Sequence, residues 1–407
     1  MPSRRRLLAA SGICVAGLAG ASYATETPTT VSGRADWPMA RFDPACTGAT
    51  EQSGPVTEPT LRWHKLDGTR FTDHAPPALL EETLVATGDR SFAALNRDNG
   101  DLQFERNFSH ISGPTLARAD AYRHDVIAVR GTTGIYGLSS AGGFEVAGID
   151  VGLQRWHTPQ AAPPNPTGVV RKASTVAVDG VIYGVVPETN RIVALDANSG
   201  RLRWERKIGR DAHPEANRPA VRNGTVFATS PVDTVVALDA ETGATKWEVG
   251  LPELDTDARR YREPNAPTAT EMGVLVPTRA GILLLDAKTG ERHWEYVHEG
   301  RAMTGTAAVA DGTVVVTDGR DTLHGISLDD GEALWQSSYR PDTHPIIADG
   351  IIYLTYHSVP ELHAFELETG DHLWERDIPA TPSQPVVSDG DLYLSTFEGI
   401  LALGDDA

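Results

Sequence analysis

Short runs of alternating apolar and polar residues recur along the chain, each opened by an Asp-Gly or Asn-Gly pair. Examples are "DGVIYGVV", "NGTVFATS", "DGTVVVTDG" and "DGIIYLTY", which begin at Asp179, Asn223, Asp311 and Asp349. An alternation with a period of two, entered through such a turn, predicts β-strands joined by tight hairpins. No segment of helical length between these runs shows a clean period of 3.6 residues. The pattern therefore predicts an all-β protein.

A second pattern follows each of these runs. The stretch "ALDAETGATKW", Ala237 to Trp247, has close copies that end at Trp204, Trp294 and Trp374. Its glycine recurs at intervals of about 40 residues, with one longer gap, and a unit of this length holds four short strands. Such a period is typical of β-propeller blades. The motif glycines are Gly100, Gly143, Gly200, Gly243, Gly290, Gly331 and Gly370.

The residues of the motif have a structural explanation. An Asp such as Asp239 accepts backbone N–H bonds across a tight turn, and Gly243 adopts a positive φ without strain. The Trp that follows is large enough to pack between neighbouring blades. We therefore interpret these residues as structural: Asp196, Gly200, Trp204, Asp239, Gly243, Trp247, Asp286, Gly290, Trp294, Gly331, Trp335, Gly370 and Trp374.

The two ends of the repeat region set the number of blades. The C-terminal "GILALGDD" stops before its Gly-x-x-x-Trp half, and Trp63 near the N-terminus stands on a strand with no partner before it. Combining them gives an eight-bladed β-propeller of four-stranded blades, closed by a blade shared between the N- and C-termini. Seven blades is the alternative, because the second motif is degraded. Ala147 replaces its Trp, and an insertion at Arg155 to Gly168 is rich in proline, which disfavours strands.

The motif "ALDAxTGxxxW" resembles the repeat of quinoprotein-like propellers, the family of the pyrroloquinoline-quinone (PQQ) dehydrogenases. The resemblance runs from Thr60 to Asp405, and "WPMARFDPACTG", Trp37 to Gly48, is similar to the lead-in segment of such propellers. Similar repeats occur in the lipoprotein scaffold of the outer-membrane barrel assembly machinery, which binds no quinone. The resemblance thus implies the fold and leaves the activity open.

Ligands of propellers usually meet the loops around the central channel. The segments that lead into the innermost strands would bring polar residues of separate blades to one axial mouth. We expect a ligand site there and assign no catalytic residue. The predicted site residues are His74, Lys172, Arg218, Asn265, Thr304, His344 and Gln384.

A PQQ enzyme would need more than this mouth. The resemblance to the dehydrogenases implies an adjacent cysteine pair and a Glu–Asn–Asp set that holds calcium under the quinone. The chain has two cysteines, Cys14 and Cys46, and Cys14 lies in the expected signal peptide. The histidines form no HxxxH or HxH pair, so we expect neither a metal site nor a cofactor. PQQ with calcium belongs only to the alternative hypothesis.

The N-terminus predicts export. Arg4, Arg5 and Arg6 precede an apolar run, Leu7 to Gly20, that is too short to span a bilayer. Residues 1–24 resemble a twin-arginine signal peptide. Residues 25–57 then form a lead-in arm and residues 58–407 the propeller, and no transmembrane segment is expected after the signal is removed.

The surface charge narrows the partners. The formal net charge is −19, and Lys is rare among the 36 basic residues, as in proteins adapted to high salt. A negative surface repels nucleic acids and anionic membranes. The sequence therefore predicts an exported, extracytoplasmic binding or scaffold module whose partner is a protein, a peptide or a small anionic ligand. The alternative is a PQQ-dependent dehydrogenase of alcohols or sugars.

Overall fold

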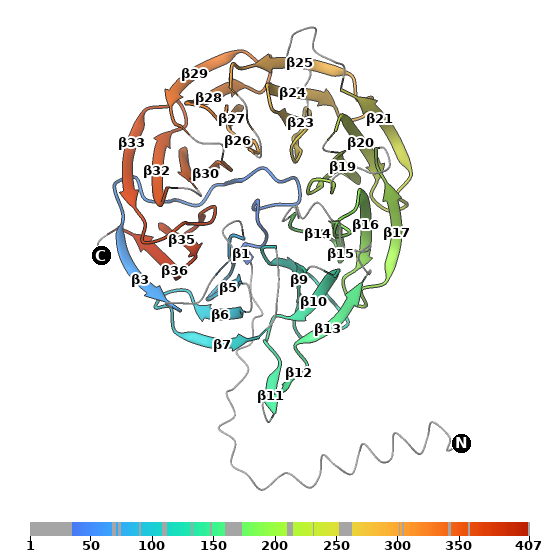
Figure 1. Ribbon diagram of the computed structural model, residues 1–407, viewed down its shortest axis with the longest axis vertical. Helices are drawn as coiled ribbons and strands as arrows, with labels where there is room; N and C mark the ends of the chain where they lie inside the picture. Colours follow the sequence, from blue (N-terminus) through green and yellow to red (C-terminus); the bar gives the residue numbers. More distant parts are fainter. Residues whose placement is uncertain are drawn as a thin grey trace, which may run out of the picture.

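The computed structural model describes most of the chain after the N-terminal segment. The described residues are 35–66, 71, 75–88, 91–107, 112–131, 133–146, 149–158, 173–209, 215–230, 232–251, 263–300, 302, 305–340, 343–356 and 359–405. Within these ranges every regular element is a β-strand, and eight four-stranded sheets form a closed ring (Figure 1). No helix in the described part of the chain has the length and apolar character needed to cross a membrane. The predicted all-β class is confirmed.

Blades 1 to 7 run from the innermost to the outermost strand in chain order. Blade 1 comprises β4 (Ala78–Leu80), β5 (Thr83–Thr87), β6 (Phe92–Asn96) and β7 (Leu102–Arg106); blade 2 comprises β8 (Thr115–Ala117), β9 (Val126–Arg130), β10 (Ile135–Ser139) and β13 (Gln154–Thr158), with an added hairpin of β11 (Phe144–Val146) and β12 (Ile149–Val151). Blade 3 comprises β14 (Val176–Val178), β15 (Val181–Val185), β16 (Arg191–Asp196) and β17 (Leu202–Lys207); blade 4 comprises β18 (Ala220–Arg222), β19 (Thr225–Ser230), β20 (Thr234–Asp239) and β21 (Thr245–Gly250).

The second half of the ring repeats this order. Blade 5 comprises β22 (Thr268–Ala269), β23 (Gly273–Thr278), β24 (Gly281–Asp286) and β25 (Arg292–Val297); blade 6 comprises β26 (Ala308–Ala310), β27 (Thr313–Thr317), β28 (Thr322–Ser327) and β29 (Ala333–Ser338). Blade 7 comprises β30 (Ile346–Ala348), β31 (Ile351–Thr355), β32 (Glu361–Glu366) and β33 (His372–Asp377); blade 8 comprises β34 (Val386–Ser388), β35 (Asp391–Thr396), β36 (Gly399–Gly404) and β3 (Thr60–Lys65). Two short strands, β1 (Ala35–Trp37) and β2 (Ala49–Thr50), belong to the lead-in arm.

Blade 8 closes the ring. Its outermost strand β3 pairs antiparallel with the last strand β36, so that Leu61 lies opposite Leu403 and Trp63 opposite Ala402. Arg62 adds an ion pair to Asp391 on the neighbouring strand β35, with Nη1 2.7 Å from Oδ2. This sheet contains both ends of the repeat region, as the sequence predicts. The count of eight blades is confirmed, and the seven-bladed alternative is wrong.

The repeated motif joins each blade to the next. The ring of Trp204, in blade 3, packs on Gly243 of blade 4, where a Cβ would lie 2.6 Å from the ring, and Gly243 has a φ of 68°. The indole Nε1 donates to the carbonyl oxygen of Ala240 at 2.9 Å. Trp247 and Trp294 make the same bond to the blades that follow them, at 3.0 and 2.9 Å. The turn is held by Asp239, whose Oδ1 accepts the backbone N–H of Thr242 at 3.0 Å.

Blade 2 departs from the prediction. Its anchor is Trp156, which packs on Gly200 and donates to the carbonyl of Ala197 at 2.9 Å, and not the region of Ala147. The extra hairpin β11–β12 moves the outer strand further along the chain, to β13. The first residues of the stretch assigned to a proline-rich insertion, Arg155 to Thr158, are therefore strand. The prolines come later, in residues 159–168, which lie outside the described residues.

Candidate functional site

The lead-in arm lies across the central axis of the propeller (Figure 1). Its described part begins as β1, which pairs antiparallel with the innermost strand of blade 1, and later forms β2, which pairs parallel with β30 of blade 7. Between them its carbonyls accept N–H bonds from the innermost strands of blades 2, 4, 5, 6 and 7. The bonds run from Leu116 to Pro38 (2.8 Å), Val221 to Pro44 (2.6 Å), Ala269 to Ala45 (2.8 Å), Val309 to Thr47 (3.0 Å) and Ile347 to Gly48 (2.9 Å). The arm thus caps backbone donors that would otherwise face the channel.

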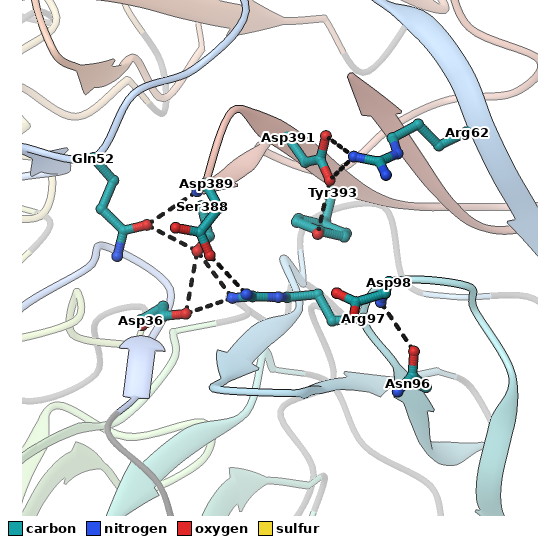
Figure 2. A network of polar contacts seen from close by, with 10 residues as sticks. All are labelled: Asp36, Gln52, Arg62, Asn96, Arg97, Asp98, Ser388, Asp389, Asp391 and Tyr393. Atoms are coloured by element: carbon teal, nitrogen blue, oxygen red, sulfur yellow. Dashed lines mark hydrogen bonds and ion pairs between the residues drawn. The ribbon is translucent and has the colours of Figure 1, made fainter. Parts of the chain in front are cut away.

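Both ends of this arm meet at blade 8 (Figure 2). Arg97 of blade 1 pairs with Asp36 of β1 and with Asp389, the latter at 2.7 Å. It also donates to Ser388 Oγ at 3.0 Å, and this oxygen lies 2.8 Å from the side-chain carbonyl of Gln52. Ser53 accepts the N–H of Gly390 at 3.0 Å. The arm therefore returns to the place where it starts and forms an inner ring.

Arg41 occupies the middle of the arm and is only 1% exposed. Its Nη1 donates to the carbonyl of Pro345 at 2.7 Å and to Gln384 Oε1 at 3.1 Å, while Nη2 donates to the carbonyl of Ala307 at 2.8 Å. Burial, together with the neighbouring cation of Arg218, lowers the pKa of Arg41 to about 9. The side chain holds three blades together at the axis.

Four of the seven predicted site residues lie in the described part of the chain. Arg218 and Gln384 come together around Arg41, and Gln384 also donates to the carbonyl of Ala40. His344 Nδ1 lies 3.1 Å from Thr306 Oγ1 in the neighbouring blade. Asn265 is 4% exposed, with its backbone N–H bonded to the carbonyl of Pro277 at 2.8 Å. The other three, His74, Lys172 and Thr304, lie outside the described residues.

These axial residues do not fit a calcium-bound quinone. Calcium takes oxygen ligands and favours carboxylates, but Arg41 and Arg218 place positive charge here. Glu215, a buried carboxylate in the segment before β18, is paired with Arg130 at 2.5 Å. Cys46 is a buried free thiol whose Sγ lies 3.5 Å from the carbonyl of Pro219. The described residues at this place therefore do not supply the donor set that the dehydrogenase hypothesis requires.

The capping by the arm is interrupted at blade 3. In β14, Ala177 lies opposite Ile182, just as Val309 lies opposite Val314 in blade 6. The shared register turns the N–H of Ala177 away from its own sheet and toward the arm. Within the described residues no carbonyl of the arm accepts this N–H, and no hydrogen bond joins blade 3 to the arm.

A cleft of about 530 Å3 opens beside Ala177. Its walls come from the arm, from blade 2 after β8, and from the β14–β15 turn. The rim carries the exposed ion pair Arg118–Asp120, with Nε 3.1 Å from Oδ1, and Tyr122, whose ring stacks under Arg155 with the guanidinium carbon 4.1 Å from its centre. The lining residues are Pro38, Met39, Pro44, Leu116, Arg118, Ala119, Asp120, Tyr122, Asp125, Ala177, Val178, Asp179 and Gly180.

The cleft thus combines an apolar floor, an unused backbone donor and a charged rim. These are the features of a site that binds a small ligand or a short extended peptide.

Comparison with known proteins shows to which propeller family the chain belongs. The family model described as "Outer membrane protein assembly factor BamB" matches residues 60–209 and 188–405. The chain belongs to this family. The predicted PQQ-like repeat propeller is confirmed.

Relatives in this family are distant. The outer membrane protein assembly factor BamB of Yersinia pestis is 24% identical over 305 residues, which cover 70% of this chain and 65% of that protein. The match therefore spans slightly less than two thirds of the length of the Yersinia protein. The crystal structure of BamB from Moraxella catarrhalis superimposes with a TM-score of 0.63 at 16% identity, covering 86% of this chain and all of the other. The quinohemoprotein alcohol dehydrogenase of Comamonas testosteroni gives 0.66 at 12% identity, with 91% and 81% covered. These structures share the fold.

Sequence reasoning missed the arm as part of the site. It looked for polar residues on the loops of the propeller, but Arg41 and the capping carbonyls come from the lead-in segment. One signal was present, because an arginine in a segment with Trp37, Met39 and Cys46 stands among residues that favour burial. No sequence pattern indicated the missing hydrogen bond between the arm and blade 3, because it depends on the position of an arm carbonyl in the folded protein.

Proposed function

We propose that this protein is an extracytoplasmic protein-binding module that holds an extended segment of a partner in the cleft beside Ala177. The observation that carries the proposal is the interruption of the inner ring. In five blades a carbonyl of an extended chain bonds to the inner strand, whereas in blade 3 Ala177, whose N–H has no such acceptor among the described residues, lines a cleft. The group that completes the pattern is a backbone carbonyl, which every extended peptide offers.

The walls of the cleft favour a partner with particular side chains. Leu116, Met39 and Pro44 offer apolar contact, while Arg118 and Asp120, each 80% exposed, offer charges of both signs on the rim. A peptide with an apolar residue flanked by charged ones matches this arrangement. The similarity to assembly factors and the twin-arginine-like N-terminus support a partner outside the cytoplasm.

The test uses a substitution that removes the donor alone. Ala177→Pro eliminates the N–H and fills its place with ring carbon, while the hydrogen bonds between β14 and β15 use other residues. The probe is a displayed library of random twelve-residue peptides, selected on the purified full chain. Selected peptides are then titrated by fluorescence anisotropy. Binding should weaken at least fivefold in Ala177→Pro, since a backbone hydrogen bond is lost and the approach is blocked.

Two further variants keep this test decisive. Arg118→Glu reverses a charge on the rim without touching the backbone and should alter which peptides bind. Phe397→Ser, at a residue 40% exposed outside the cleft, serves as the control and should leave affinity unchanged. Equal binding by wild type, Ala177→Pro and Arg118→Glu would overturn the proposed site. Reduction of a dye that depends on added PQQ and calcium would instead support the dehydrogenase.

A further inference from the structure

A second group of side chains lies on the outer hairpin of blade 7, away from the axis. His363 stands on β32, directly opposite Glu375 on β33. A bulge between Ala364 and Phe365 shifts the register, and it brings His372 to the same place. His363 Nδ1 lies 3.3 Å from His372 Nε2 and 3.8 Å from Glu375 Oε2.

Another carboxylate fixes how His363 presents this atom. Its second nitrogen, Nε2, lies 3.3 Å from Glu361 Oε2. When Nε2–H donates to that carboxylate, Nδ1 carries a lone pair and faces the other two groups. Three electron-pair donors then converge on one point, each within 4.8 Å of the others. A cation at that point removes the repulsion between them.

The distances suit one class of cation. Zinc binds imidazole nitrogen at about 2.0–2.1 Å, and two such ligands of a tetrahedral ion lie about 3.3–3.4 Å apart. The separation of the two histidine nitrogens, 3.3 Å, agrees with this value. Two imidazoles and one carboxylate form a borderline ligand set for zinc and its neighbours, whereas calcium and magnesium prefer all-oxygen sites.

The histidines are held in place before any ion binds. The ring of Tyr339, a residue only 6% exposed, stands edge-on to His363 with ring centres 5.3 Å apart. Phe365 packs against His372 at 4.9 Å. Only 14% of the His363 side chain is exposed, in contrast to 70% for Glu375. The site is therefore buried on one side and open to solvent on the other.

We propose that His363, His372 and Glu375 bind a zinc ion on the outer hairpin of blade 7, with Glu361 orienting His363. Three protein ligands leave one position of the tetrahedron for water. Glu361 then acts as the carboxylate partner that commonly fixes a ligating histidine. The site is independent of the cleft at blade 3, so either proposal stands if the other fails. It escaped sequence reasoning because nine residues and a hairpin separate the two histidines.

The experiment is a calorimetric titration of ZnCl2 into tag-free full chain that has been stripped with a chelator. The buffer contains about 1 M KCl, because the acidic surface attracts divalent ions and salt shortens the Debye length to about 3 Å. Wild type should bind one equivalent. His372→Ala should weaken the affinity at least tenfold, and Glu361→Gln about tenfold to a hundredfold.

His293→Ala is the matched control. This exposed histidine lies on β25 next to a Trp, 3.4 Å from the carboxylate of Asp286, and should leave the titration unchanged. Far-ultraviolet circular dichroism of each variant verifies that the fold is retained. No saturable zinc binding, or equal binding by His372→Ala and His293→Ala, would overturn the site.

Discussion

Blades 3 and 6 have the same strand order and register but differ where they meet the axis. In blade 6 the N–H of Val309 donates to the carbonyl of Thr47 at 3.0 Å, and in blade 3 the equivalent N–H of Ala177, a residue that lines the cleft, has no acceptor among the described residues. The repeat specifies both blades equally, so the difference arises from the arm. A segment outside the repeat decides which blade is sealed and which is open to a partner.

The largest loss of stability should follow from a substitution at the centre of the arm, which caps blade 6 and leaves blade 3 uncapped. Arg41→Ala leaves the buried carbonyls of Pro345 and Ala307 without their donor and creates a cavity. We expect a loss of about 4 kcal/mol in the free energy of unfolding, measured by urea denaturation. Arg320→Ala, whose side chain is 60% exposed, is the control and should change it by less than about 0.5 kcal/mol. Equal stabilities would show that the arm contributes little.

A smaller effect should follow from removing one capping bond. Val309→Pro deletes the N–H that Thr47 accepts and places ring carbon against its carbonyl. The expected loss is about 2 kcal/mol by the same denaturation, because the carbonyl of Thr47 loses its donor. Retained stability would mean that the carbonyl of Thr47 finds another donor.

The same substitution in blade 3 should have almost no effect. Ala177→Pro removes a donor that has no acceptor among the described residues, so the free energy of unfolding should stay within about 0.5 kcal/mol of wild type. The difference between the two proline variants, measured side by side, is the direct test of the comparison. If Ala177→Pro destabilises as strongly as Val309→Pro, the N–H already has a partner within the protein.

Native-state hydrogen exchange detects the finest difference. The amide of Val309 is hydrogen-bonded to the carbonyl of Thr47, and it should exchange only when the arm opens. The amide of Ala177, beside the cleft, has no acceptor among the described residues and should exchange faster. Adding a peptide that binds the cleft should slow Ala177 and leave Val309 unchanged. If the amide of Ala177 exchanges as slowly as that of Val309 without peptide, the proposal that its N–H lacks an acceptor is wrong.

The fold was predictable because its signals are local and repeated. Asp239, Gly243 and Trp247 perform in one blade what their counterparts perform in the others, so the seven motif glycines marked seven of the eight blades. Trp63 and the final strand were recognisable as two halves of one blade for the same reason. The anchor of blade 2 was not predicted, because Trp156 follows an inserted hairpin and does not have the spacing that marks the motif.

The site was only partly predictable. Arg218 and Gln384 were expected at the axial mouth, and they lie around Arg41, a residue of the arm. Nothing in the spacing of the repeats indicates how the irregular segment between β1 and β2, with Pro38, Pro44 and two non-glycine residues of positive φ, Phe42 and Cys46, will cross that axis. Its path depends on contacts with residues far away in sequence, such as Arg41 with Gln384, and no local pattern encodes such contacts.

The meeting of both arm ends at Ser388 also bears on the order in which the molecule assembles. The arm is synthesised first, but its partners Gln384, Ser388 and Gly390 belong to the last blade. Loop closure over more than three hundred residues is entropically costly and forms late. A ribosome must therefore release nearly the entire chain before the inner ring can form. Chains truncated near the C-terminus would retain most blades but would lack the contacts between the arm and blade 8. The inner ring can therefore close only in a chain that includes the last blade.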